Sequence, residues 1–261
     1  MTARVAAALL AIAGAGLCLS LSAAAESNRD GDLLVTFDGS LHPKMLPRDA
    51  PAPVAIRVAG NVRSVSGEAG AIPQLRTISV GINREGRLFD RGLPICRVRA
   101  IRAATQKAAR RICEDAIVGS GHIRVQVRIP GQLPFAVNAN LLAFNGPRQG
   151  GSKLIIAQTY SRRPPGSFIL LFRVDRAPGL FGTVLSTVLP RRARNWAFLT
   201  HFDMTLHRRY SYRGEPRSFV SAACAAPSGF DTVVFPLARA TYGFANGQRL
   251  VTSVARTCHV G

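Results

Sequence analysis

The segment NWAFLTHFDMTLH, residues 195–207, carries the best candidates for metal chemistry. His201 and Asp203 are two residues apart, so on a β-strand they share one face, with about 7 Å between their Cα atoms. His207 is six residues from His201, about 20 Å along an extended chain, and cannot join them. Because a metal site normally needs three or four convergent groups, we predict a solvated strand face with no bound metal. His201 and Asp203 remain weak metal candidates.

This segment has a counterpart near the start of the chain. Residues 202–207 read FDMTLH and residues 37–42 read FDGSLH, both with the pattern F-D-x-[ST]-L-H. A second match, at nearly the same spacing, aligns residues 80–98 with residues 242–260. Two matches in the same order predict an internal duplication of a few strands. A polar stripe drawn from both copies would comprise Asp38, His42, Asp203 and His207. This stripe is the basis of an alternative function, a secreted hydrolase acting on envelope polymers or glycans.

The segment LHRRYSYRGEPR, residues 206–217, interleaves arginine with tyrosine. Together these residue types favour sugar stacking, cation–π contacts and anion binding. The predicted anion- or glycan-binding residues are Arg208, Arg209, Tyr210, Tyr212, Arg213 and Arg217. The alternative is a basic hairpin whose tyrosines are half-buried at a sheet edge.

Four cysteines follow the N-terminal segment, an even number that is typical of disulfides in an oxidising compartment. They are Cys96, Cys113, Cys224 and Cys258. Three pairings are possible from the spacing alone. Because the duplication places Cys96 and Cys258 at equivalent positions, we predict that each pairs within its own copy, Cys96 with Cys113 and Cys224 with Cys258. Each bridge then contributes about 3 to 4 kcal/mol by loop entropy.

Residues 1–25 have the pattern of a secretory signal peptide. Arg4 precedes an apolar stretch, residues 5–21, and Ala23 to Ala25 provide small residues for cleavage. The alternative is an uncleaved anchor, since the apolar run is slightly long. No later stretch approaches 18 uninterrupted apolar residues, so we expect no transmembrane span after cleavage. The expected location is outside the cell or in the extracytoplasmic envelope.

The chain is strongly basic, with 34 Lys and Arg against 14 Asp and Glu and a formal net charge of +20. The basic residues are spread along the whole chain, which argues against a dedicated nucleic-acid partner. For an exported protein, the expected anionic partners are envelope polymers, lipid headgroups or glycans.

Signatures of common enzyme classes are missing from the sequence after residue 25. G-x-S-x-G, H-E-x-x-H, the P-loop and G-x-G-x-x-G do not occur, and no C-x-x-C points to zinc or redox chemistry. We therefore expect no cofactor and favour a non-enzymatic role, with catalysis left open.

The elements that must position these residues are mostly short strands. Extended segments rich in Val, Ile, Phe, Thr and Tyr alternate with turn signals such as NREG and ANGQ. This pattern predicts an antiparallel all-β fold of the sandwich type. Helical spacing of Ile101, Ala104, Ala108, Ile112 and Ala116 predicts one helix over 101–116. The duplication predicts two β modules, 26–146 and 147–261, either separate or packed as one domain.

The sharpest alternation predicts the buried side of one strand. Within residues 196–206, the core face should carry Trp196, Phe198, Thr200, Phe202, Met204 and Leu206. His201 and Asp203 would then face solvent.

The segments LPRDAPAPV, RGLPIC, LLAFNG, FVSAAC and FPLARATY resemble a group of secreted bacterial proteins with no assigned activity. The resemblance covers most of the chain after residue 25; it implies an exported domain and carries no site residues. The leading interpretation is a disulfide-stabilised binding or structural protein of the envelope or extracellular space.

Overall fold

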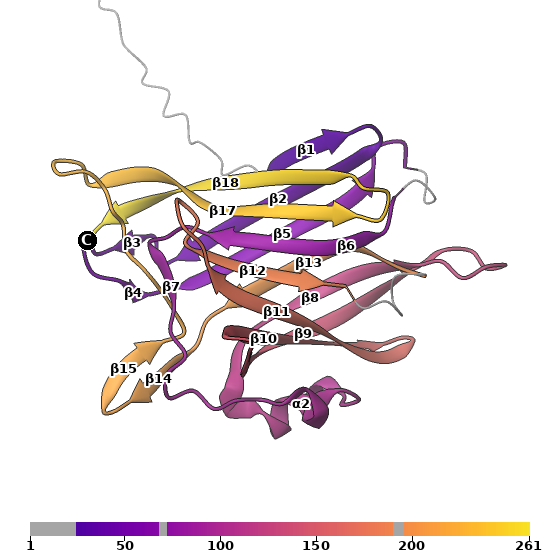
Figure 1. Cartoon of the computed structure of the whole chain (residues 1–261), viewed down its shortest axis with the longest axis horizontal. Helices are drawn as coiled ribbons and strands as arrows, with labels where there is room; N and C mark the ends of the chain where they lie inside the picture. Colours follow the sequence, from indigo (N-terminus) through magenta and orange to yellow (C-terminus); the bar gives the residue numbers. More distant parts are fainter. Residues whose placement is uncertain (1–24, 68–71, 190–195) are drawn as a thin grey trace, which may run out of the picture.

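The computed structural model describes residues 25–67, 72–189 and 196–261, and its dominant feature is one large sheet (Figure 1). In spatial order the thirteen strands are β1 (Glu26–Asp30), β2 (Leu33–His42), β5 (Ala55–Ser64), β13 (Ala197–Leu206), β8 (Ile117–Val127), β9 (Phe135–Gln149), β10 (Ser152–Arg162), β11 (Pro165–Arg176), β12 (Thr183–Val188), β6 (Leu75–Ile82), β17 (Thr232–Phe244), β18 (Arg249–Val260) and β3 (Met45–Leu46). Every pairing is antiparallel except that of β18 with β3. The predicted all-β class is confirmed.

Two small sheets flank the large one. The first consists of β4 (Ala52–Pro53), β16 (Val220–Ala222) and β7 (Gly86–Leu88), and the second is the hairpin of β14 (Arg209–Tyr212) and β15 (Glu215–Ser218). The predicted signal peptide and its cleavage site lie outside the described residues, apart from Ala25.

The large sheet curls until its first strands lie against β18 (Figure 1). Asn28 Nδ2 donates to the Val251 carbonyl at 2.9 Å, and Gln248 Nε2 donates to Asp30 Oδ2 at 3.0 Å. The concave face encloses one apolar core to which strands from both ends and from the middle contribute. The strands form one continuous curled sheet. The sandwich type and the internal duplication stay predictions.

Strands of the two predicted modules alternate within this sheet. β13 lies between β5 and β8, and β6 lies between β12 and β17. The two segments thus share one sheet and one core, and the division at residue 146 stays a prediction.

The helical segment predicted near residues 101–116 is present, but it is not one continuous helix. The chain instead forms α1 (Val98–Ile101), α2 (Gln106–Ile112) and a 3-10 turn, η1 (Glu114–Ala116). The Thr105 side chain accepts a hydrogen bond from the Ala108 N–H and starts α2, because a capping hydroxyl satisfies a free amide at a helix N-terminus. Ile101, Ala109 and Ala116 are buried and Ile112 is exposed, so the buried side is not one continuous stripe.

These short helices cover the convex face of β9 and β10. Their buried residues form a small second core with Leu142, Phe144 and Ile156. The Cys96–Cys113 disulfide joins the two ends of the helical segment, and Cys224 is joined to Cys258. Both predicted pairings are confirmed.

The predicted core face of residues 196–206 is half wrong. A β-bulge between Leu199 and His201 shifts the register against β8, and an extra residue in one strand reverses the alternation on either side of it. Beyond the bulge, Met204 and Leu206 are buried as predicted. Before it, Leu199 is buried and Trp196 is 47% exposed.

Candidate functional site

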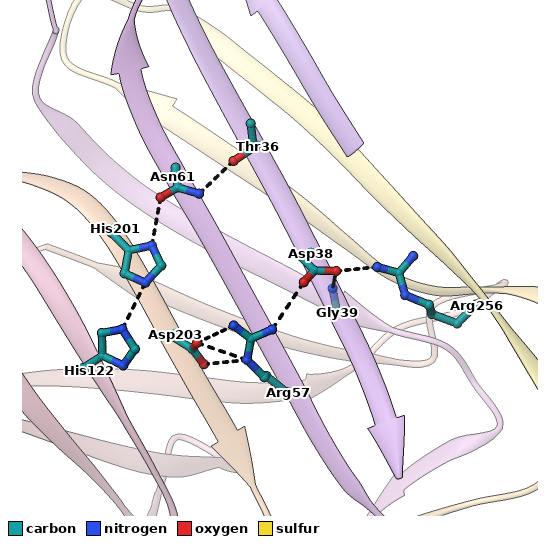
Figure 2. Close-up of polar contacts among 9 residues, drawn as sticks. All are labelled: Thr36, Asp38, Gly39, Arg57, Asn61, His122, His201, Asp203 and Arg256. Atoms are coloured by element: carbon teal, nitrogen blue, oxygen red, sulfur yellow. Dashed lines mark hydrogen bonds and ion pairs between the residues drawn. The ribbon is translucent and has the colours of Figure 1, made fainter. Parts of the chain in front are cut away.

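The convex face of the sheet carries a grid of polar side chains in strand register. Asp38 on β2 pairs with Ala59 on β5, which pairs with Asp203 on β13, which pairs with His122 on β8. One row along, Asn61 pairs with both Thr36 and His201. Figure 2 shows two sets of polar contacts side by side, a charged cluster around Arg57 and a chain from Thr36 through Asn61 and His201 to His122. Together they are called the convex network.

Arg57 joins the two aspartates of this network. Its guanidinium extends from β5 between them, donating from Nη1 to Asp38 Oδ2 at 3.2 Å and from Nη2 to Asp203 Oδ2 at 2.5 Å (Figure 2). Its Nε also donates to Asp203 Oδ1 at 3.1 Å. Ala59 is in register with both aspartates, has a small side chain and is 5% exposed. The long side chain of Arg57, two residues away on the same face of β5, therefore covers Ala59 and reaches both carboxylates.

The same arrangement explains where the repeated hexapeptides lie. Residues 37–42 are on β2 and residues 202–207 include the end of β13, and these two strands flank β5. Both aspartates pair with Ala59. Each hexapeptide therefore supplies one carboxylate to Arg57.

One further ion pair completes the charged cluster. Arg256 on β18 forms an ion pair with Asp38, and its side chain is only 11% exposed. The hydrogen bonds that Arg57 donates to Asp203 are the main reason why the pKa of Arg57 is raised, since they stabilise its charged form. The positive charges of two arginines thus balance the negative charges of two aspartates across strands β18, β2, β5 and β13.

His122 and His201 face each other beside this cluster. Their rings are 5.1 Å apart between centroids, and their Nε2 atoms are 3.2 Å apart. His201 Nδ1 lies 2.8 Å from Asn61 Oδ1, and Asn61 Nδ2 donates to Thr36 Oγ1 at 3.0 Å (Figure 2). Burial, followed by the nearby His122, lowers the pKa of His201 and favours its neutral form.

Replacing Arg57 with methionine should lower the free energy of unfolding by about 2 kcal/mol. The loss arises because the Asp203 side chain, 13% exposed, would lose its cation while remaining partly buried; the figure is below that of a fully buried pair because Arg57 is 40% exposed. Urea unfolding measures it. Arg63→Met, on the exposed side of the same strand, is the control and should cost under about 0.5 kcal/mol.

Adding Asp203→Asn to Arg57→Met should recover more than half of the loss, since the uncompensated charge disappears. A double variant no more stable than Arg57→Met would contradict this origin of the effect.

The structure brings together only part of the predicted polar stripe. Asp38 and Asp203 meet at Arg57, whereas His42 and His207 are exposed at strand ends, and no contact of the described residues draws either histidine into the network. His122 was missed by sequence reasoning. Its only signal was a single histidine in an extended segment, which does not identify β13 as the neighbouring strand.

The predicted basic segment forms the hairpin β14–β15, which lies beside the large sheet in Figure 1. Arg213 and Gly214, at its tip, have φ of 56° and 80°, which suits a two-residue type I′ turn. The Tyr210 hydroxyl donates to the Arg91 carbonyl at 3.0 Å, and the Tyr212 ring packs edge-on against Phe89 at 6.2 Å.

The tyrosines therefore anchor the hairpin. Burial raises the pKa of Tyr210 to about 12. Arg208 is half-buried and lies 3.6 Å from Asp115. Arg209, Arg213 and Arg217 are exposed and have no ion pair within the described ranges. Of the six predicted residues, these three present charge to solvent.

Lys153 is a charged group inside the fold near this hairpin. Its Nζ lies 3.5 Å from Asp90 and 4.1 Å from the centre of the Phe219 ring. Burial lowers its pKa to about 8, partly opposed by Asp90. The folded chain is thus expected to release this proton about two pH units before the unfolded chain does.

The lowered pKa of Lys153 predicts that the stability of the fold rises with pH. Between pH 8 and pH 10 the unfolded state binds more protons at this lysine than the folded state, so the free energy of unfolding should increase, by about 2 kcal/mol. Above about pH 10, ionisation of tyrosines in the unfolded state opposes this trend, because folding raises the pKa of Tyr210. Urea unfolding at each pH should show the rise in the native chain and not in Lys153→Met; an equal rise in both would refute the assignment.

The enclosed space of the curled sheet offers little room for a ligand. Among the described residues, the inner cavity measures about 40 Å³ and is lined by apolar side chains such as Ile123, Phe172 and Phe202. Small-molecule sites usually measure several hundred Å³. This enclosed cavity is therefore a weaker candidate than the convex network or the hairpin.

Comparison of the chain with known protein families, curated proteins and solved structures found no match. Across the described part of the chain, no helix is long and apolar enough to cross a membrane.

Proposed function

We propose that the chain is an exported, non-enzymatic binding protein whose partner is an anionic polymer of the cell envelope. The observation that carries the proposal is the group of three exposed arginines on the β14–β15 hairpin: Arg209, Arg213 and Arg217. The part of the chain that the structure describes provides none of them with an acidic partner. The two disulfides and the N-terminal sequence support export.

Rigid anchoring makes the hairpin suitable for such binding. Tyr210 and Tyr212 hold it against the Phe89–Gly92 segment, so its arginines lose less freedom on binding than they would on a flexible loop. Arg217 lies 5.7 Å above the Phe89 ring and Arg213 lies 5.3 Å from the Tyr212 ring. Planar guanidinium groups held in this way favour phosphate and carboxylate groups.

The test is binding of the purified, oxidised chain to isolated cell walls across a salt titration. About three phosphate or carboxylate contacts should make the affinity fall roughly 10- to 50-fold between 50 and 200 mM salt. The variant Arg209→Ala, Arg213→Asn, Arg217→Ala should lose most of the binding; asparagine at position 213 tolerates the positive φ.

The control removes the same charge elsewhere. Arg102, Arg110 and Arg111 are exposed near the helices, and replacing all three with alanine should leave wall binding within about twofold. Equal losses in both triple variants would reduce the effect to net charge. Binding to anionic phospholipid vesicles and not to walls would contradict the polymer as partner.

A further inference from the structure

The histidine pair on the convex face has a geometry that a shared cation would stabilise. His122 and His201 come from neighbouring strands, β8 and β13, and are diagonal neighbours, because His201 pairs with Arg124, two residues from His122. Their Nε2 atoms point at each other across 3.2 Å. At this separation two protonated rings would repel, whereas one proton or one metal ion between them is attracted to both nitrogens.

The third ligand is Asp203. Its carboxylate and the two imidazoles offer ligand atoms that all lie within 4.8 Å of one another. Two nitrogens bound to one tetrahedral ion at about 2.05 Å are about 3.3 Å apart, close to the observed Nε2 separation. Two histidines and one carboxylate, with water at the remaining position, are a common set for Zn²⁺.

The outer contacts already orient these ligands. In the observed orientation of Asn61, its Oδ1 accepts the Nδ1 proton of His201, which leaves the lone pair of Nε2 directed at His122. Arg57 fixes the Asp203 carboxylate, and Oδ1, which accepts only one hydrogen bond there, keeps a free lone pair. Such partners set the tautomer and direction of metal ligands.

We propose that His122, His201 and Asp203 bind one divalent transition-metal ion of the Zn²⁺ type. Because His122 is exposed, its ring can carry its proton on Nδ1 in water while Nε2 binds the ion, and solvent can fill the open position. The nearby guanidinium groups of Arg57 and Arg124 weaken attraction for a cation, so the affinity should be moderate. This site is independent of the hairpin and of the proposed polymer partner.

The experiment is calorimetric titration of the purified, tag-free chain with ZnCl₂ in a buffer that does not bind metals, after removal of bound metal with EDTA. We expect one ion per chain. His122→Gln and His201→Gln should each weaken binding at least tenfold, and Asn61→Ala, which frees the His201 ring, should weaken it about tenfold. His207→Gln, an exposed histidine just after the same strand, is the matched control and should bind as the native chain does.

Thermal unfolding of the same samples separates loss of the site from loss of the fold. Zinc should raise the Tm of the native chain and of His207→Gln, because it binds only the folded state. At the same zinc concentration it should raise the Tm of His122→Gln by less, and the Tm of this variant without zinc should stay near that of the native chain. Absence of one-to-one binding in the native chain, or equal affinity in His122→Gln, would overturn the proposal.

Discussion

Replacing both Cys224 and Cys258 with alanine is expected to lower the free energy of unfolding by about 4 kcal/mol. The bridge closes a loop of 34 residues, and in the loop-entropy model such a constraint removes a large part of the unfolded chain's freedom. Both cysteines are buried, at 0% and 1% exposed, in the main core, so lost packing adds to the effect. Urea unfolding of the oxidised native chain and of the variant measures the difference.

The second disulfide provides the comparison. The Cys96–Cys113 bridge closes 17 residues, and removing it should cost about 3 kcal/mol, mostly through the helical segment and the small core beneath it. If removing either bridge changed stability by less than about 1 kcal/mol, the restraint on the unfolded chain would be absent. Pairing itself is checked with Cys224→Ala, which should leave one reactive thiol, Cys258, in denaturant.

Tyr242→Ala should cost about 4 kcal/mol, in the range observed when a large buried aromatic side chain is truncated. Tyr242 is fully buried and is among the largest such side chains in the protein. It extends from the concave face of β17 towards β2, where its hydroxyl lies 3.4 Å from the Thr36 carbonyl. The ring therefore packs at the place where the two ends of the sheet meet.

Two controls separate the ring from the hydroxyl. Tyr242→Phe keeps the ring and loses one long hydrogen bond, so it should cost no more than about 1 kcal/mol. Gly60→Ala would bring a methyl group within 2.5 Å of the Phe202 ring and 2.7 Å of the Tyr242 hydroxyl, which should cost about 1 to 3 kcal/mol. The cost should be smaller in the Tyr242→Phe background. A Tyr242→Ala variant as stable as Tyr242→Phe would refute a role of the ring in closing the sheet.

The failures of sequence reasoning have specific physical causes. The helix expected over residues 101–116 followed apolar spacing, but Thr105 can cap a new helix, and a local hydrogen bond of this kind competes with continuation of the first one. The face of residues 196–206 was predicted from strict alternation, and one bulged residue next to His201 reverses that alternation. Neither the helix cap nor the bulge alters the apolar pattern from which these predictions were made, so that pattern could not reveal them.

The candidate site shows the same division. His201 and Asp203 could be placed on one strand face from their spacing, and the repeated hexapeptides pointed to Asp38 as a related residue. Arg57 and His122 carry no comparable signal, because the local sequence of β5 or β8 does not show which strands pair with them. Their roles depend on which strands pair and in which register.

The sequence by itself determined the β class and most strand positions, because these depend on side-chain alternation and turn residues. It left three cysteine pairings open; the pairing predicted through the duplication is confirmed by the structure. Only the tertiary structure decided that β13 lies between β5 and β8, that two aspartates from opposite parts of the chain share Arg57, and that His122 meets His201. Strand order follows from the total free energy of non-local pairing and core packing. A local pattern records that a face is buried, and not which distant strand buries it.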